Sequence, residues 1–151
     1  MSMHGATWRV HTSSLDDVEL IQDAISWIAG DESTISIDKD KSIHGAIQKA
    51  IIAKVDRKSG AIESLERLGI EILQELLDDD LGMRIDDDKN MHIRIDVANL
   101  VQKKISISKT DAKKLVAKGI FKIECYPGDD PVIVLSKLIN NIIKKNKNIN
   151  L

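Results

Sequence analysis

Residues 83–96, MRIDDDKNMHIRID, carry the triplet Arg-Ile-Asp twice, once on each side of a polar segment. Apolar and charged side chains alternate before and after that segment, and this two-residue period is typical of half-buried strands. The stretch therefore predicts a β-hairpin, and it fixes one buried face and one charged face.

The loop length of this hairpin follows from its apolar pattern. A three-residue loop at 88–90, with Asn90 in the left-handed conformation, pairs Ile85 with Ile93 and keeps the apolar face intact. A two-residue loop would pair Ile85 with His92 and break that face, so the three-residue loop is preferred.

The same register brings charged residues together on the other face. Arg84 is expected opposite Arg94, and Asp86 opposite His92. Asp96 falls diagonal to Arg84, where the register predicts a salt bridge. The charged face of the hairpin would thus combine two guanidinium groups with nearby carboxylates.

Periodicity and turn residues outline the rest of the chain. Ser14 followed by Asp17 is a helix-capping signature, and Gly30 suits the end of the helix that follows. Residues 43–55 fit either a helical face or a strand, and their β-branched side chains favour the strand. The other expected strands cover 7–12, 34–38, 105–107 and 120–125, and the other expected helices cover 62–77 with a division at Gly69, 97–104, 110–118 with Gly119 at its end, and 131–145.

An α+β fold, with an antiparallel sheet and helices packed mainly on one face, best satisfies this order of elements. With 151 residues the chain suits a single domain, with an ordered core at 7–145 and a frayed tail at 146–151. Aromatic residues make up only 3% of the chain, so the core is expected to be aliphatic. No apolar segment approaches the roughly 20 residues of a membrane span, and the single cysteine, Cys125, indicates a reducing cytoplasm.

Charge is distributed unevenly along the chain. Residues 97–151 hold eleven lysines against four acidic residues, a net charge of +7, whereas residues 1–96 carry −9. Such asymmetry marks a polyanion-binding side when the two parts stay apart in space. If strands from both parts intermix, their fields cancel, and the sequence leaves both interpretations open.

No residue pattern names a reaction. Six aspartates flank the hairpin, yet their spacing matches no metal-binding loop, and a solvated helix end and turn explains them. The histidines form no i, i+4 pair and no Cys/His cluster, so neither a metal site nor a cofactor is expected. Cys125 has no evident base beside it and is expected to be a small core residue. The sequence contains no Gly-rich phosphate loop or nucleophile elbow, so no catalytic residue is assigned.

Several basic residues are candidates for gripping phosphates. Arg84 and Arg94 share the predicted strand face, and further basic residues follow it and precede the helix at 62–77. A sheet face is a common RNA platform, but with almost no aromatic side chains to stack on bases, backbone recognition with a strong salt dependence is expected. The alternative is a salt-bridged solvent face typical of a heat-adapted protein rich in Lys and Ile. The candidate RNA-binding residues are Arg84, Arg94, Lys103, Lys104, Arg57, Lys58, Lys54, His44 and His92.

Four segments in order resemble a family of small archaeal proteins described as predicted RNA-binding proteins or exosome subunits. The resemblance spans roughly residues 8–126 and departs from the family's usual residues at 13–14, 46–48 and 97. It implies an α+β fold like that of the ribosomal protein that contacts 5S RNA, with no cofactor and no established catalysis. The segments that carry it are Thr12-Ser13-Ser14-Leu15-Asp16-Asp17, His44-Gly45, Arg84-Ile85-Asp86 and Arg94-Ile95-Asp96.

The residues and the resemblance together indicate a non-catalytic RNA-binding or RNA-processing accessory protein, associated with an exosome or a ribosome. Its expected partners are RNA and protein subunits of an RNA-processing complex in the cytoplasm, with no membrane contact. The alternative is a protein–protein interaction module or homodimer that uses its Ile-rich C-terminal helix or an open sheet edge. A continuous positive surface favours the first hypothesis, and an exposed apolar patch favours the second.

Overall fold

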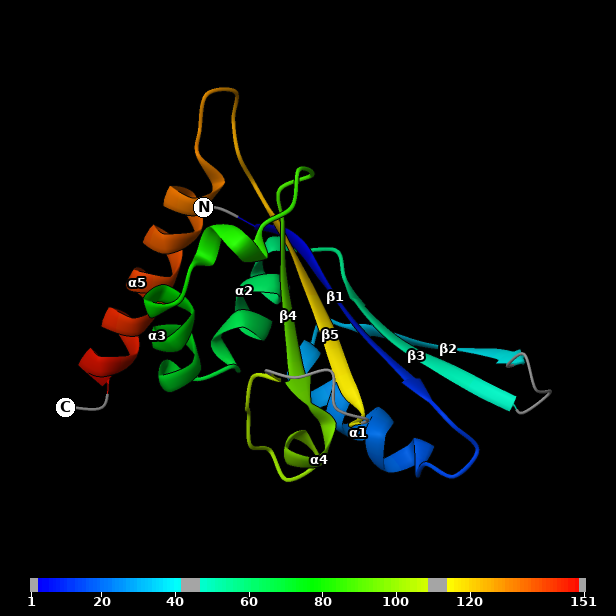
Figure 1. The fold of residues 1–151 in the computed structure, drawn as a ribbon. Coiled ribbons are helices and arrows are strands. Elements are labelled where there is room, and N and C mark those ends of the chain that lie inside the picture. Colours follow the sequence, from blue (N-terminus) through cyan, green and yellow to red (C-terminus); the bar gives the residue numbers. More distant parts are fainter. Residues whose placement is uncertain (1–2, 42–46, 109–113, 150–151) are drawn as a thin grey trace.

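A computed structural model describes residues 3–41, 47–108 and 114–149 (Figure 1). The strands are β1 (Met3–Thr12), β2 (Thr34–Lys41), β3 (Ile47–Val55), β4 (Asn90–Asp96) and β5 (Val116–Ile123). The helices are α1 (Val18–Ala29), α2 (Lys58–Glu66), α3 (Ile70–Asp78), the 3-10 helix η1 (Leu81–Arg84), α4 (Val97–Leu100) and α5 (Pro131–Ile149). Among these described helices, none is both long and apolar enough to cross a membrane.

The strands form one sheet in the order β2-β3-β1-β5-β4, and every neighbouring pair is antiparallel. Successive side chains of β1, β4 and β5 alternate between buried and exposed positions, so one face of the sheet is covered. Helices α1 and α2 pack on β1 and α5 packs on β5, which leaves the opposite face open (Figure 1). The predicted α+β fold with helices mainly on one face is confirmed.

Trp8 and Phe121 lie at the centre of the covered face. Both side chains are fully buried, and their rings meet edge to face with centroids 5.8 Å apart. Gly119 stands beside Trp8 in the sheet register, and a Cβ there would lie 2.7 Å from the indole ring. The position therefore accepts only glycine without rearrangement, while the core around it is aliphatic, as predicted.

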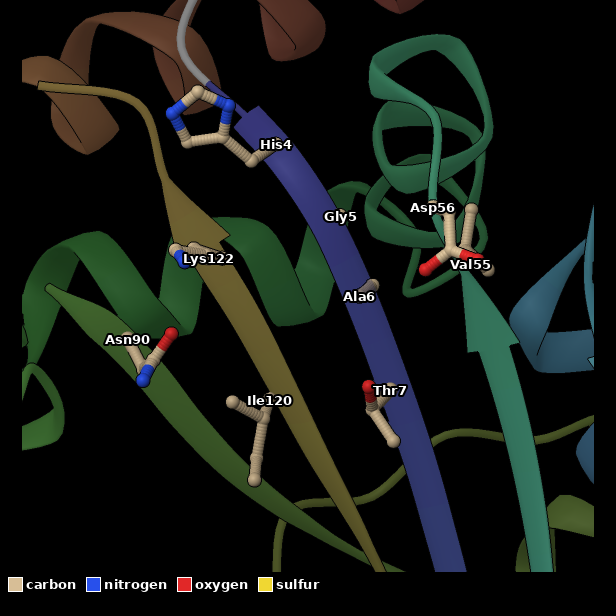
Figure 2. A pocket seen from close by; sticks show the side chains of 9 residues that line it. All are labelled: His4, Gly5, Ala6, Thr7, Val55, Asp56, Asn90, Ile120 and Lys122. Atoms are coloured by element: carbon tan, nitrogen blue, oxygen red, sulfur yellow. The ribbon is translucent and has the colours of Figure 1, made fainter. Parts of the chain in front are cut away.

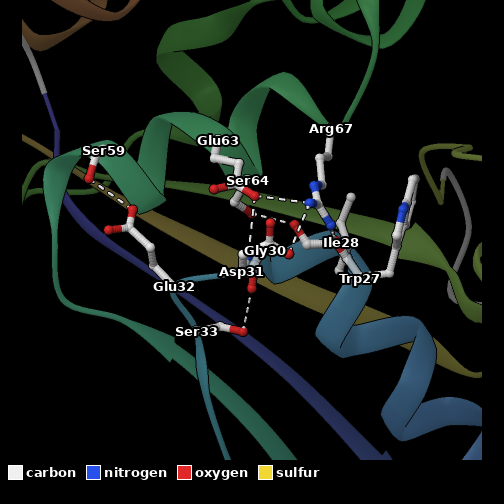
Figure 3. A network of polar contacts seen from close by, with 10 residues as sticks. All are labelled: Trp27, Ile28, Gly30, Asp31, Glu32, Ser33, Ser59, Glu63, Ser64 and Arg67. Carbon is white, nitrogen blue, oxygen red and sulfur yellow. Dashed lines mark hydrogen bonds and ion pairs between the residues drawn. The ribbon is translucent and has the colours of Figure 1, made fainter.

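A buried polar network joins α1 to α2 and to the sheet (Figure 3). The Trp8 Nε1–H donates to Ser64 Oγ at 2.8 Å, and that hydroxyl donates to the Ile28 carbonyl at 2.7 Å. Arg67 donates to the Trp27 carbonyl and, at 2.9 Å, to Glu63 Oε1. Because each buried polar group has a partner, the network fixes α1 and α2 relative to β1 without leaving an unsatisfied donor.

The predicted hairpin at 83–96 is wrong in its first strand. Arg84 ends the 3-10 helix η1, and Ile85 makes a single bridge to Met91 rather than pairing with Ile93. The left-handed residue of the turn is Lys89, with φ of 64°, and not Asn90. Only the second triplet lies in a strand, β4.

The local cause is the side chain of Asp86, which competes with strand pairing. Its Oδ1 accepts hydrogen bonds from the backbone N–H groups of Asp88 and Asn90, both at 2.9 Å. Asp side chains that bond nearby backbone favour a tight turn over an extended ladder. Leu81 is buried just upstream, so the chain before the turn is held as η1 against α3 rather than as a strand.

Two boundary predictions are also wrong. Residues up to 118 were expected to form a helix ending at Gly119, but Gly119 lies in the middle of β5, where it makes room for Trp8. The cap of α1 is Asp17, whose Oδ1 accepts from the Leu20 N–H, and not Ser14. The start of that expected helix at Thr110 lies outside the described residues.

The remaining predicted boundaries of helices and strands differ less from the observed ones. The ambiguous segment forms strand β3 from Ile47 onward, as favoured, while its residues 43–46 lie outside the described ranges, and Gly69 does divide α2 from α3. The short strand expected at 105–107 is reduced to one bridge between Ile107 and Ile95. Helix α5 continues past the expected end at residue 145 to Ile149.

Candidate nucleic-acid interface

The open face of the sheet carries most of the basic side chains that the strands contribute. Because the covered face takes every second residue of each strand, the residues between them face solvent. The exposed basic residues on this face are Arg9 on β1, Lys54 on β3, Arg94 on β4, and Lys118 and Lys122 on β5.

Three of these cations stand side by side across the sheet. Arg9 pairs with Lys118 in the register of β1 and β5, and Lys118 pairs with Arg94 in the register of β5 and β4. Neighbouring strands are about 4.8 Å apart, so the three positions span roughly 10 Å. We call Arg9, Lys118 and Arg94 the basic row.

Like charges directly opposite one another in a sheet repel, so the basic row is electrostatically costly in isolation. Phosphates placed across the row would relieve that repulsion. Lys54 pairs with Thr7, two positions along β1 from Arg9, and Lys122 lies further along β5. These two lysines extend the positive face toward the beginning of β1.

The basic face draws on both parts of the uneven charge distribution. Arg9, Lys54 and Arg94 come from the acidic part of the sequence, whereas Lys118 and Lys122 come from the basic part. Antiparallel pairing of β1 and β4 with β5 brings them together. The spatial patch therefore follows the sheet topology and not the net charge of either half.

His92 also lies on the open face, two residues before Arg94 on β4, and its side chain contacts a carboxylate. Its Nε2 lies 2.7 Å from Asp86 Oδ2. This hydrogen bond, together with the backbone N–H groups of Asn90 and Asp88, lowers the pKa of Asp86. The predicted proximity of Asp86 and His92 is thus confirmed, although the turn that produces it differs from the predicted one.

Arg84 does not share the open face with Arg94, contrary to the prediction. Its Nη2 lies 3.4 Å from Asp79 Oδ2, and no salt bridge to Asp96 forms between these described residues. Arg84 lines a hollow at the end of α3 together with Glu75 and Asp78. It is therefore surrounded by carboxylates, an environment that disfavours a phosphate.

The other predicted lysines and arginines fall at two ends of the sheet. Arg57 and Lys58 follow the end of β3, which lies beside the beginning of β1. Lys103 and Lys104 follow α4, beyond the end of β4 and beside the beginning of β5. These pairs flank the open face from opposite ends and do not form one cluster, and His44 lies outside the described residues.

A β-bulge in β1 adds a hollow to the open face (Figure 2). Met3 pairs with Ile123 and Gly5 with Lys122, so His4 is the extra residue and its side chain is exposed. The hollow has a volume of about 240 Å³. It is lined by His4, Gly5, Ala6, Thr7, Val55, Asp56, Asn90, Ile120 and Lys122.

Sequence reasoning missed Arg9, Lys118 and Lys122. The alternation of residues 7–12 did place Arg9 on a polar face, but no sequence signal paired β1 with β5. Lys118 was assigned to a helix because Gly119 was interpreted as its end. A glycine inside an alternating segment was the available hint of close packing by a large side chain on a neighbouring strand.

Within the described residues the open face presents no metal-binding cluster and no Phe, Tyr or Trp ring, and Tyr126, which is 68% exposed, lies in the segment between β5 and α5. No group of three or more His, Cys, Asp or Glu within the described ranges is placed to hold a metal. Burial raises the pKa of the Cys125 thiol, which makes it a poorer nucleophile. Trp8 and Phe121 are buried under the sheet, so neither ring is available to stack on a base from the open face.

Three solved structures from archaea have a similar fold. A DUF54 protein from Methanothermobacter thermautotrophicus aligns with a TM-score of 0.73 at 17% identity, covering 95% of this chain and 99% of its own. A DUF54 protein from Sulfolobus solfataricus aligns at 0.67 and 16% identity, covering 94% and 98%. A UPF0201 protein from Methanococcus jannaschii aligns at 0.57 and 10% identity, covering 92% of each chain. At these identities the likeness establishes the fold alone.

A comparison with family models identifies the family of this chain, which the solved structures alone do not. No curated protein matches this chain. The family model described as RNA binding matches residues 6–124, which cover the sheet from Ala6 in β1 to the end of β5 and include the basic row. The chain therefore belongs to the family that this model describes as RNA binding.

Proposed function

We propose that this protein is a non-catalytic RNA-binding accessory protein that holds the phosphodiester backbone of RNA on the open face of its sheet. The basic row carries the proposal, because three in-register cations form a preorganised site for phosphates. The family described as RNA binding supports the same ligand.

We expect recognition of the RNA backbone because the described strands present no Phe, Tyr or Trp side chain on the open face. RNA-binding sheets that read sequence stack bases on exposed aromatic side chains. Here Trp8 and Phe121 face the core instead. We therefore expect weak sequence preference and a strong dependence on salt, since each neutralised phosphate releases counterions.

The basic residues at the two ends of the sheet extend this proposal. Arg57 and Lys58 beyond β3, and Lys103 and Lys104 beyond α4, would attract the strand as it enters and leaves the open face. Lys54 and His92 would contact phosphates next to the basic row. In this function the protein would act in the cytoplasm as a subunit or cofactor of an exosome or a ribosome, in line with the family resemblance.

A second candidate function is a protein–protein contact at the edge of the sheet. Within the described residues β2 pairs only with β3, so its outer edge is open to another strand. Ile37 on this edge strand is 39% exposed. An added strand from a second copy of this chain would use the free backbone groups. Sedimentation of the free protein tests this candidate, because it predicts a dimer and the RNA proposal requires none.

The RNA proposal is tested by fluorescence anisotropy with an unstructured RNA of about 12 nucleotides. We expect the protein to bind at about 50 mM salt and to weaken steeply by about 200 mM. The variant Arg9→Gln/Lys118→Gln/Arg94→Gln should lower the salt slope by about 2, because each lost contact to a single strand removes about 0.7.

A charge-matched control separates this site from general electrostatics. Lys137→Gln/Lys144→Gln/Lys145→Gln removes the same charge from exposed positions on α5, on the helix side of the sheet. This control should keep the wild-type slope and nearly the wild-type affinity. Equal losses in the two triple variants, or no RNA binding by the wild type at low salt, would refute the proposal.

A further inference from the structure

The hollow at the β1 bulge lies on the same open face as the basic row. Gly5 and Lys122 stand four residues along their strands from Arg9 and Lys118, which corresponds to roughly 13 Å. An RNA strand bound at the basic row can therefore reach the hollow along the same face of the sheet. Its lining differs from the row, because it contains an acidic residue.

The backbone creates this hollow. The bulge turns both His4 and Gly5 away from the covered face, whereas regular alternation would expose only one of them. Gly5 contributes no side chain, and a Cβ there would lie 2.6 Å from the Val55 carbonyl oxygen. The space beside Asp56 thus depends on glycine at this position.

Asp56 is the residue that defines the chemistry of the hollow. It directly follows β3 and lies across β1 from Lys122, with His4 at the upper end of the hollow in Figure 2. The carboxylate is exposed, and within the part of the chain that the structure describes it makes no hydrogen bond or ion pair. An ionised carboxylate only accepts hydrogen bonds, so its ligand must supply donors.

RNA offers three kinds of group, and two of them fit poorly beside Asp56. A phosphate would be repelled by the carboxylate. A base carries N–H donors, but it would find a single ring to stack on, the exposed imidazole of His4, because no Phe, Tyr or Trp lines the hollow. The ribose hydroxyls are donors, and an acidic side chain that accepts from a ribose 2′-OH is a recurring way to bind nucleosides.

We propose that the hollow binds a ribose of the RNA strand, with Asp56 accepting hydrogen bonds from its hydroxyl groups and Lys122 contacting the adjoining phosphate. Lys122 lies about two strand spacings from Asp56, roughly 10 Å, which suits a sugar and its phosphate. This inference rests on the proposed RNA-binding function. It adds that the protein distinguishes RNA from DNA.

The test compares anisotropy titrations of the whole protein with an RNA of about 12 nucleotides and a DNA of the same sequence. A third probe is the RNA with a 2′,3′-dideoxy terminal sugar. We expect the wild type to prefer RNA by about tenfold, the typical worth of one hydrogen bond to a charged group. If the hollow binds the terminal diol, the third probe should bind more weakly than the unmodified RNA. If it binds an internal 2′-OH, the third probe should bind as tightly as the unmodified RNA.

The decisive variant is Asp56→Ala. It removes a negative charge, so general electrostatics predicts tighter binding of both nucleic acids. If Asp56 binds ribose, DNA binding should hold or rise while RNA binding falls, and the two affinities should come within about twofold. The matched control is Asp38→Ala on β2, exposed and far from the hollow, which should change both affinities in parallel and keep their ratio.

The outcomes separate this inference from the function on which it rests. Equal affinity of the wild type for RNA and DNA, or an unchanged ratio in Asp56→Ala, overturns the ribose site while leaving backbone binding intact. If the basic-row variant binds RNA and DNA more weakly while the ratio of the two affinities stays constant, the basic row is supported as the phosphate-binding site. A wild type that binds neither nucleic acid overturns both proposals.

Discussion

The two copies of Arg-Ile-Asp have the same sequence and opposite surroundings. In the first, Arg84 ends a 3-10 helix, is partly buried and pairs with Asp79. In the second, Arg94 stands in a regular strand with Lys118 beside it, and Arg9 follows on the next strand. One arginine is neutralised by its neighbours, and the other adds to a positive row.

The difference shows that residue type alone does not decide the electrostatic surroundings of an arginine. A guanidinium group lined by carboxylates lies in a negative environment that disfavours a phosphate, whereas cations side by side in a sheet register create a positive one. The turn at Asp86 decides which triplet enters the sheet. We make four predictions from this contrast, and the first changes the packing of the strand that carries Lys118 of the basic row.

The largest effect is expected from Gly119→Ala, directly beside Lys118 in β5. The added methyl group would lie within 2.9 Å of three atoms of the Trp8 ring, so the strand or the indole must move. Overpacking of this kind costs about 1–3 kcal/mol in the free energy of unfolding. Urea denaturation measures it, with Gly82→Ala as a contrasting variant whose added Cβ meets only ordinary contacts at 3.4 Å or more. A loss at Gly119 no greater than at Gly82 would contradict the packing argument.

The next effect concerns RNA affinity at the two arginines. We expect Arg94→Ala to weaken binding several-fold at low salt and to lower the salt slope by about 0.7, because one phosphate contact is lost. Arg84→Ala should leave both affinity and slope within error. Anisotropy titrations at several salt concentrations measure this. Equal losses in the two variants would show that the contrast in surroundings has no bearing on binding.

Stability should separate Arg84 from the middle residue of the basic row. Arg84→Ala breaks an ion pair whose side chains are 23% and 60% exposed, so a loss of about 0.2–1 kcal/mol is expected in the free energy of unfolding. Lys118→Ala relieves repulsion in the row and should cost less, or stabilise the fold slightly. Thermal unfolding at low and high salt provides the measurement, and the difference should shrink as salt rises.

The smallest effect is the pH dependence at the turn that separates the two triplets. The hydrogen bond to His92 lowers the pKa of Asp86, so the carboxylate stabilises the fold above its ordinary titration range. That contribution is lost as the pH falls through the lowered pKa. Asp86→Asn should therefore be less stable than the wild type at about pH 7, and the gap should narrow by about pH 2. A gap that widens on acidification would contradict the assignment.

The sequence by itself determined the class of fold and most of its elements. Alternation at β1 and β4, the helical stripe divided at Gly69, and Pro131 at the start of α5 are local signals, because each depends on residues near one another in the chain. For the same reason the sequence placed Arg94 and His92 on one charged strand face, whereas Lys54 was expected only among the basic residues before the next helix. Its error at Arg84 arose from a local pattern that a side-chain-to-backbone turn overrode.

Only the tertiary structure decided where the basic face lies. Arg9 and Lys118 are far apart in sequence and meet because β5 inserts between β1 and β4. Asp56 and Lys122 share a hollow because the β1 bulge and Gly5 make room between them. Strand order and register are set by the packing of Trp8, Phe121 and the aliphatic core under the sheet, and no local residue pattern encodes that pairing.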